Sequence, residues 1–258
     1  MSASPALLLS FGLLFFCRFP PLSLCISNGS VKHLSGLAVV AFMALAFQNA
    51  FGLGDDQAPL VNNIRLSTRH HWMRQANEAL LHVRGTPCPF NAFGSVIVNH
   101  TAGGLGEMVC IGANDIASGN PTIHGEIAAI NNCSAILTDP DGPYRLTGGE
   151  AQLAWADLSL YTNAEPCSMC ASAIRWAGFK ELVFGSSTAD LEERGWPMIS
   201  LSAEALFGYA TGLGTETAIL KRVLSNETDV YFGWQFDAAQ PCPAGCQRAK
   251  RRCQKMDL

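Results

Sequence analysis

The chain has 258 residues, of which 48% are hydrophobic, so it is long enough for one ordinary domain with segments left over. Its formal charge is −4, and residues 1–54 contribute no Asp or Glu to it. A net acidic body argues against a large polyanionic partner, which would need clustered Lys and Arg, so the composition speaks against nucleic acid as a partner.

The first fifty residues have the pattern of a targeting segment. Two apolar runs lie at residues 6–16 and 34–47, and the second follows Lys32 and His33 in the layout of a signal peptide. Both runs are shorter than the roughly 18 apolar residues of a spanning helix, so we expect no stable membrane span. We therefore predict a signal or targeting segment at residues 1–50 and a secreted protein, or one of the secretory pathway. Two membrane anchors, or a cytosolic protein with an apolar tail, are the alternatives, and either run can be the true signal.

Sequons and cysteines in the rest of the chain also favour export. Asn99, Asn132 and Asn226 each begin an Asn-x-Ser/Thr acceptor sequence, which predicts a glycoprotein. Of the ten cysteines, six lie outside both the leader and a Cys-x-x-Cys pair, and an even number permits three disulfides in any of 15 pairings. These six are Cys88, Cys110, Cys133, Cys242, Cys246 and Cys253. Buried free thiols are the alternative.

Helices and strands are predicted to alternate after a polar linker at residues 51–66. Ser67 or Thr68 is expected to cap a first helix that runs to about His82. The strands and helices that follow form a hairpin and then an alternating series. In chain order they are strands 93–98 and 108–113, helix 121–136, strand 158–162, helix 166–177, strand 181–184, and a fifth strand or closing helix within 215–223. This order predicts an α/β sandwich around a mixed sheet.

The C-terminal segment differs in composition from the predicted domain. We assign residues 67–235 to the domain and residues 236–258 to a basic, cysteine-containing tail with five Lys and Arg residues. The tail is expected to be either disulfide-tied or flexible. A basic patch for an anionic partner is a further interpretation of it.

Two short motifs carry the chemistry of the predicted domain. The first includes His124 and Glu126, and the second includes Cys167 and Cys170 after Pro166. One imidazole and two thiolates suit a tetrahedral Zn²⁺ site whose fourth position is left to water, which is typical of catalytic rather than structural zinc. Cys167 and Cys170 are three residues apart, so in the first turn of a helix they point to the same side. The sequence predicts one zinc ion per chain, held by His124, Cys167 and Cys170.

Glu126 is predicted to be the catalytic base rather than a ligand. At positions i and i+2 of a helix, two side chains diverge by about 200°, so His124 and Glu126 can serve one site only where a helix begins. A carboxylate beside the metal can accept a proton from water and pass it to a ring nitrogen and then to a departing amine. Zinc lowers the pKa of bound water to about 7, which makes hydroxide available near neutral pH.

Cys-x-x-Cys alone has other interpretations. It also occurs as a redox pair, as a disulfide, or as half of a closed zinc knuckle. A redox pair gives no reason for His124 and Glu126, so the combination of both motifs favours a catalytic zinc site.

The motifs also carry a family resemblance. His-x-Glu followed by Pro-Cys-x-x-Cys is the signature of zinc deaminases. Residues 120–130 and 165–174, within a likeness that runs from about 68 to 200, resemble the guanine deaminase and tRNA adenosine deaminase branch of the cytidine/deoxycytidylate deaminase superfamily. The resemblance implies a three-layer α/β/α sandwich on a mixed five-stranded sheet, a homodimer, zinc on His124, Cys167 and Cys170, and a proton shuttle at Glu126.

The resemblance also implies which residues contact the substrate. Asn114 falls where the family has a substrate-binding Asn, Phe93 where a pocket-lining strand begins, and Trp176 where guanine deaminases carry an aromatic residue. Core packing is the alternative for the two aromatics. The family has Ala where this chain has Gly125, and the smaller Gly is expected not to block the site. Guanine deaminases place acidic residues after a Gly-aromatic pair near the C-terminus, whereas Pro197 follows here, which weakens guanine as the substrate.

The sequence therefore predicts a zinc-dependent hydrolase that replaces the amine of a nucleobase or small nucleoside by a carbonyl and releases ammonia. One alternative is a deaminase of adenosine or cytidine in tRNA or another polynucleotide. A non-catalytic, zinc-stabilised secreted module is the other, although an intact Glu126 has no use in a purely structural site.

Overall fold

The computed structural model describes residues 60–256, and the targeting segment and most of the predicted linker lie outside them. None of the helices in residues 60–256 is both long and apolar enough to span a membrane. The first helix, α2 (Leu66–Arg84), begins one residue before Ser67, and Arg65 precedes it without a capping side-chain hydrogen bond, so the predicted Ser67 or Thr68 cap is wrong. It ends at Gly85, whose left-handed backbone (φ 71°) closes the helix.

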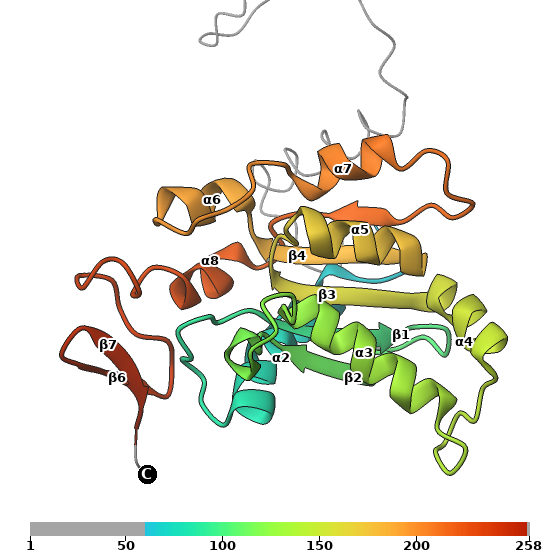
Figure 1. Ribbon diagram of the computed structural model, residues 1–258, viewed down its shortest axis with the longest axis horizontal. Helices are drawn as coiled ribbons and strands as arrows, with labels where there is room; N and C mark the ends of the chain where they lie inside the picture. Colours follow the sequence, from blue (N-terminus) through green and yellow to red (C-terminus); the bar gives the residue numbers. More distant parts are fainter. Residues whose placement is uncertain (1–59, 257–258) are drawn as a thin grey trace, which may run out of the picture. The chain divides into compact units, whose positions relative to one another are not determined.

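Five strands form one mixed sheet in the order β2-β1-β3-β4-β5 (Figure 1). They are β1 (Gly94–Asn99), β2 (Glu107–Ala113), β3 (Leu158–Ala164), β4 (Glu181–Ser186) and β5 (Ala218–Leu220). Strand β1 pairs antiparallel with β2 and β3, whereas β3, β4 and β5 run parallel. The segment left open as a fifth strand or a helix therefore contains the short strand β5.

Side chains that alternate along the strands build two cores, one on each face of the sheet. Val96, Tyr161 and Val183 pack against α2, while Ile97 and Leu160 belong to the cluster on the opposite face. That second face is covered by α3 (Gly125–Thr138) and α5 (Ser168–Ala177), which lie in front of the sheet in Figure 1. The three-layer α/β/α sandwich on a mixed five-stranded sheet is confirmed.

Short helices connect and follow the sheet. On the way to β3 the chain forms α4 (Gly148–Ala154), and after β4 it forms α6 (Thr188–Glu193), α7 (Ala203–Tyr209) and α8 (Ser225–Thr228). The chain ends in a hairpin of β6 (Cys246–Ala249) and β7 (Arg252–Lys255). Three 3-10 turns complete the described part: Ile116–Ser118, Trp155–Asp157 and Asp229–Tyr231.

The six cysteines predicted for disulfides form three bridges. Cys110–Cys133 joins edge strand β2 to α3. Cys242–Cys253 closes the C-terminal hairpin, and Cys88–Cys246 ties that hairpin to the segment after α2. The tail is therefore disulfide-tied, and it lies at the end of the molecule toward which the arrow of β2 points (Figure 1).

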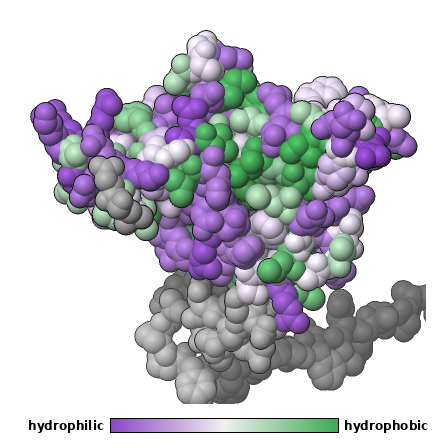
Figure 2. All heavy atoms as spheres, turned by 90° about the horizontal axis from the view of Figure 1, so that it is seen from below, coloured by the Kyte–Doolittle hydropathy of each residue, from purple (hydrophilic) through white to green (hydrophobic). Residues whose placement is uncertain are grey.

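Helix α3 lies very close to strand β2. A Cβ atom at Gly112 would stand 2.2 Å from the backbone nitrogen of Ala129, so only glycine allows this contact. Seen from below, the surface of the molecule mixes hydrophobic patches with hydrophilic areas (Figure 2). The close approach fixes the start of α3 against the sheet, where His124 and Glu126 lie.

Candidate metal centre

The two predicted motifs meet where strands β2 and β3 end. His124 is the residue that precedes α3, and its extended backbone (φ −76°, ψ 166°) turns the chain into the helix. Cys167 precedes α5 in the same way, and Cys170 lies in that helix's first turn. The helix starts after His124 and not at Pro121, which lets His124 and Glu126 face one point although they are two residues apart.

The three predicted ligands come together. The ligand atoms of His124, Cys167 and Cys170 all lie within 4.8 Å of one another, and the Sγ of Cys167 is 3.5 Å from the Nδ1 of His124. On a tetrahedral zinc ion, a sulfur at about 2.3 Å and a nitrogen at about 2.0 Å are separated by roughly 3.5 Å. The donor set and its spacing therefore fit Zn²⁺, with a fourth position left for water or substrate.

Hydrogen bonds between the two cysteines prepare them for a metal ion. The bond from the Cys170 thiol, assisted by His124, lowers the pKa of Cys167 to about 4 against the opposing effect of burial. The same bond to Cys167, together with burial, raises the pKa of Cys170. The bond to Cys167 also raises the pKa of His124. One thiolate is thus present before any metal binds, and the second thiol gives up its proton when the metal does.

Glu126 lies beside the ligands without an ion-pair partner among residues 60–256. Its side chain is only 5% exposed, and a hydrogen bond with Cys170 places it at the metal centre. Burial is the main cause that raises its pKa to about 7, and the charge of Cys167 adds to the shift. A carboxyl group with this pKa can take up and release a proton near neutral pH, as a general base must.

Two of the three residues predicted to contact the substrate lie next to this centre. The backbone N–H of Asn114 donates to the carbonyl oxygen of Phe93, and its Oδ1 accepts from Ile116, while its Nδ2 has no acceptor among residues 60–256. The Phe93 carbonyl faces Gly125, where a Cβ atom would stand 2.7 Å from it. Gly125 therefore does more than leave the site open, because it lets the Phe93 backbone approach the start of α3.

Trp176 is not brought to the metal centre. It lies at the far end of α5, its side chain is 77% exposed, and it lines a separate surface cavity. The alternative, that Trp176 packs into the core, is also wrong.

Sequence reasoning missed an aromatic cluster beside the centre. The Phe93 ring packs 5.1 Å from that of Trp196 and 5.0 Å from that of Phe232, which come from the last quarter of the chain. Phe90 extends the cluster toward the hairpin through Trp234, 6.1 Å away. No local sequence pattern announces these contacts, because they join segments more than 100 residues apart.

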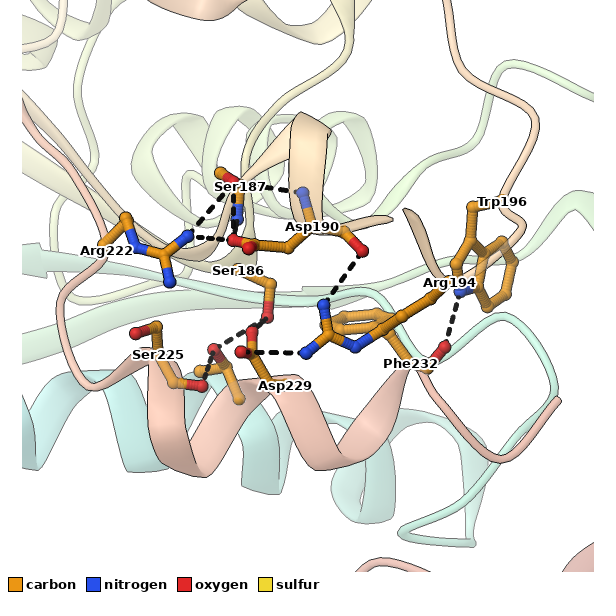
Figure 3. Close-up of polar contacts among 10 residues, drawn as sticks. Ser186, Ser187, Asp190, Arg194, Trp196, Arg222, Ser225, Asp229 and Phe232 are labelled. Carbon is orange, nitrogen blue, oxygen red and sulfur yellow. Dashed lines mark hydrogen bonds and ion pairs between the residues drawn. The ribbon is translucent and has the colours of Figure 1, made fainter. Parts of the chain in front are cut away.

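A polar network holds this cluster in place (Figure 3). Asp229 accepts hydrogen bonds from Ser186 at the end of β4 (2.5 Å) and from Arg194 (3.0 Å), while the Trp196 indole N–H donates to the Phe232 carbonyl. The same network includes the start of α6, where Ser187 and Asp190 form a capping box. The Ser-x-x-Asp pattern at 187–190 is a sequence signal for the start of this helix.

Glu165 is a second residue that the sequence analysis did not assign. Its buried carboxylate accepts the backbone N–H of Thr188 (2.8 Å) and of Ala203 (2.9 Å), which lie at the starts of α6 and α7. Because Glu165 stands two residues before Cys167, it links the metal-binding loop to both helices.

Comparisons with known proteins agree with this geometry. Residues 66–186 match the cytidine and deoxycytidylate deaminase zinc-binding region. Guanine deaminase of Bacillus subtilis is 34% identical over 105 residues, which are 40% of this chain and 56% of that protein. Probable cytosine deaminase of Schizosaccharomyces pombe is 27% identical over 38% of this chain and 49% of that protein, and tRNA-specific adenosine deaminase of Haemophilus influenzae is 36% identical over 36% and 45%.

The matched region contains every predicted zinc ligand and Glu126. The chain spans about half the length of the curated relatives it matches, and their names differ in substrate. Residues 66–186 of this chain are thus similar to the zinc-binding region of cytidine and deoxycytidylate deaminases.

Proposed function

We propose that the protein is a zinc-dependent hydrolase that replaces the exocyclic amine of a nucleobase or small nucleoside by a carbonyl oxygen. The observation that carries the proposal is Glu126, a buried carboxyl group with a pKa raised to about 7 beside a His-Cys-Cys ligand set. A structural zinc site has no use for such a group. Relatives named as guanine, cytosine and tRNA adenosine deaminases support the reaction class.

The reaction adds one water molecule to the ring carbon that bears the amine and expels ammonia. Zinc held by His124, Cys167 and Cys170, one ion per chain, would act as a Lewis acid that makes water acidic enough to lose a proton near neutral pH. Glu126 accepts that proton, delivers it to the adjacent ring nitrogen, and then moves a proton to the departing amine. The free Nδ2–H of Asn114 donates a hydrogen bond to the substrate, and the Phe93 ring lines the pocket.

Two acidic residues near the C-terminal part of the fold bear on which nucleobase is the substrate. Asp190 caps α6 and pairs with Arg222, while Glu192 accepts a hydrogen bond from Ser200. Both carboxylates thus already take part in contacts within the protein.

Ammonia release from zinc-loaded protein tests the proposal. Guanine, adenine, cytosine and their nucleosides serve as substrates, and the key variant is Glu126→Ala, with the exposed Glu193→Ala as its control. We expect Glu126→Ala to keep its zinc, measured by elemental analysis, and to lose turnover by about 10²–10⁴-fold. Turnover that survives Glu126→Ala, or activity in protein free of zinc, would overturn the mechanism.

A polynucleotide substrate is the second candidate, and the C-terminal hairpin is the observation that favours it. Lys250, Arg251 and Arg252 are exposed at its turn and form no ion pair within residues 60–256. The bridge Cys88–Cys246 holds the hairpin near Phe90, at the end of the sheet where the metal centre lies.

A single-stranded RNA oligonucleotide in the same ammonia assay separates the two candidates. If the RNA is the substrate, changing Lys250, Arg251 and Arg252 to Ala should lower the rate of ammonia release from the RNA. The same change should make that rate less dependent on salt concentration. If small molecules are the substrates, the triple variant should equal the wild type with every base.

Export, glycosylation and dimer formation are further parts of the proposal. Three disulfides among residues 60–256 support an oxidising compartment. Recovery of the protein from the culture medium of expressing cells, with a gel shift after endoglycosidase treatment, tests export and glycans at Asn99, Asn132 or Asn226. Sedimentation equilibrium tests the homodimer.

A further inference from the structure

Helices α5 and α7 border a cavity of about 370 Å³ that contains none of the metal-centre residues. Figure 1 shows the two helices side by side on the same face of the sheet. The cavity walls include Ser172, Arg175, Trp176, Leu206, Tyr209 and Leu213. Its volume lies within the range of small-ligand pockets, which begins at roughly 300 Å³.

Arg175 puts a positive charge in the wall of this cavity, and its guanidinium lies over the Phe207 ring, 5.4 Å from the ring centroid. Its side chain is 5% exposed, and no Asp or Glu in residues 60–256 forms an ion pair with it. Its guanidinium donates to neutral oxygens only: Thr217 Oγ1 at 2.8 Å, the Thr215 carbonyl at 2.5 Å and the Ala210 carbonyl at 3.4 Å. A guanidinium has five N–H groups, so two remain for a ligand.

Two aromatic side chains flank the same cavity and are unusually exposed. Trp176 is 77% exposed and Tyr209 84%, and among the large hydrophobic residues of 60–256 none is more exposed than Tyr209. Their rings make no contact with each other or with another ring in this part of the chain. Exposed apolar side chains that gather at one concave site mark a binding surface.

The buried guanidinium and the two exposed rings favour one kind of ligand. A buried cation without an anionic partner is costly, and a carboxylate or phosphate that accepts two N–H bonds from a guanidinium offsets that cost. A planar ring stacks on Trp or Tyr and removes their apolar surface from water. We propose that the cavity binds a small molecule that joins a planar ring to a carboxylate or phosphate group. The site is additional to the proposed deaminase centre and does not depend on it.

Isothermal titration calorimetry with zinc-loaded protein tests the site. The probes are adenosine 5′-monophosphate and 1-naphthoate, with adenosine, 1-naphthalenemethanol and inorganic phosphate as counterparts that lack the anion or the ring. We expect each aromatic anion to bind at least about tenfold more tightly than its counterparts.

Variants locate the binding. Tyr209→Ala and Trp176→Ala should each weaken the aromatic anions by about tenfold, as expected for the loss of one stacking ring. Leu153→Ala is the matched control, because Leu153 is also 77% exposed but lies on α4. Tyr209→Ala should leave deaminase turnover unchanged. Arg175→Lys should remove the preference for the anions, and the two aromatic variants keep the test valid if that change unfolds the 210–217 segment.

Three results would overturn the proposal. The first is that neither anion binds at millimolar concentration. The second is that charged and uncharged probes bind with equal affinity. The third is that binding survives both aromatic variants, which would place the bound molecule elsewhere on the protein.

Discussion

The two ends of strands β3 and β4 carry buried polar clusters of opposite character. At the amino end, Glu181 accepts two hydrogen bonds from Arg69 (2.9 and 3.0 Å) and one each from Ser159 and Asn62 (both 2.8 Å). At the carboxyl end, Glu126 is also buried but forms no ion pair among residues 60–256, and its pKa is raised to about 7. One carboxylate is fully satisfied by the protein, whereas the other is the group that moves protons in the proposed reaction.

The difference separates a structural cluster from a reactive one. Burial costs an ionised group several kcal/mol unless opposite charge and hydrogen bonds offset it. Arg69 provides both for Glu181, so that pair can only hold the fold together. For Glu126, the hydrogen bond with Cys170 and the charge of His124 only partly offset burial, so its pKa remains raised.

Changing Glu126 to Gln should therefore act mainly on turnover, whereas changing Glu181 to Gln should act on stability. The change at Glu126 is expected to have the larger effect. Glu126→Gln should lower turnover by about 10²–10⁴-fold, because the amide cannot accept a proton. The folded-state pKa of Glu126 lies above its usual value, so its contribution to stability is present below pH 4.5 and is lost as the pH rises through about 7. The free energy of unfolding of zinc-free Glu126→Gln, relative to that of zinc-free wild type, should thus rise by about 2 kcal/mol between pH 5 and pH 8. Urea unfolding at the two pH values measures this difference. An equal pH dependence for both proteins would contradict the raised pKa.

Glu181→Gln should act on stability alone. It leaves the Arg69 guanidinium, which is 2% exposed, without its counter-charge, and breaking a buried pair in this way costs about 3–5 kcal/mol. Urea unfolding measures the loss, and turnover per zinc-loaded, folded molecule should not change. The double change Arg69→Met with Glu181→Leu, which removes both charges, should recover much of the stability. A turnover defect in folded Glu181→Gln would mean that the two ends are coupled.

The cysteines sharpen the same contrast within the reactive end. In zinc-free protein the pKa of Cys167 is lowered to about 4 and the residue is partly exposed, whereas Cys170 is buried and its pKa is raised. Iodoacetamide should alkylate Cys167 at a nearly constant rate from pH 6 to 8, where an ordinary thiol would speed up by roughly 75-fold. Cys170 should react far more slowly, and peptide mass spectrometry distinguishes the two. Zinc should protect both.

The reactive end could be predicted from sequence because its chemistry is local. His124 and Glu126 are two residues apart, Cys167 and Cys170 are three apart, and each motif begins a helix after a strand. Together the two motifs predicted the ligand set that the structure brings together, and Glu126 stays the predicted base. The strands could be predicted for a similar reason, since each is a short run rich in apolar and β-branched residues, such as residues 95–98. Two capping boxes, Thr147–Glu150 and Ser187–Asp190, are local sequence signals for the starts of α4 and α6.

The structural end and the aromatic cluster could not be predicted because their contacts are distant in sequence. Arg69 and Glu181 are 112 residues apart, and Cys88 bonds to Cys246 across 158. A single sequence shows only that such residues exist, and it offers no way to pair them among many combinations. The double cap that Glu165 provides to α6 and α7 is hidden for the same reason.

Gly125 gives the smallest predicted effect and tests how closely the site depends on its neighbours. A methyl group there would stand 2.7 Å from the Phe93 carbonyl and 3.3 Å from the Ser95 hydroxyl. Gly125→Ala should force that carbonyl away from its bond with the Asn114 N–H and cost about 1–3 kcal/mol, measured by urea unfolding. Turnover should fall by roughly tenfold through the displaced Asn114, while zinc content stays the same. Gly149→Ala in α4 is the matched control, because nothing lies within 4 Å of its Cβ position and alanine favours the helix. If Gly125→Ala matches this control in stability and turnover, the Phe93 segment can move freely, and the close approach at the start of α3 is not what positions Asn114.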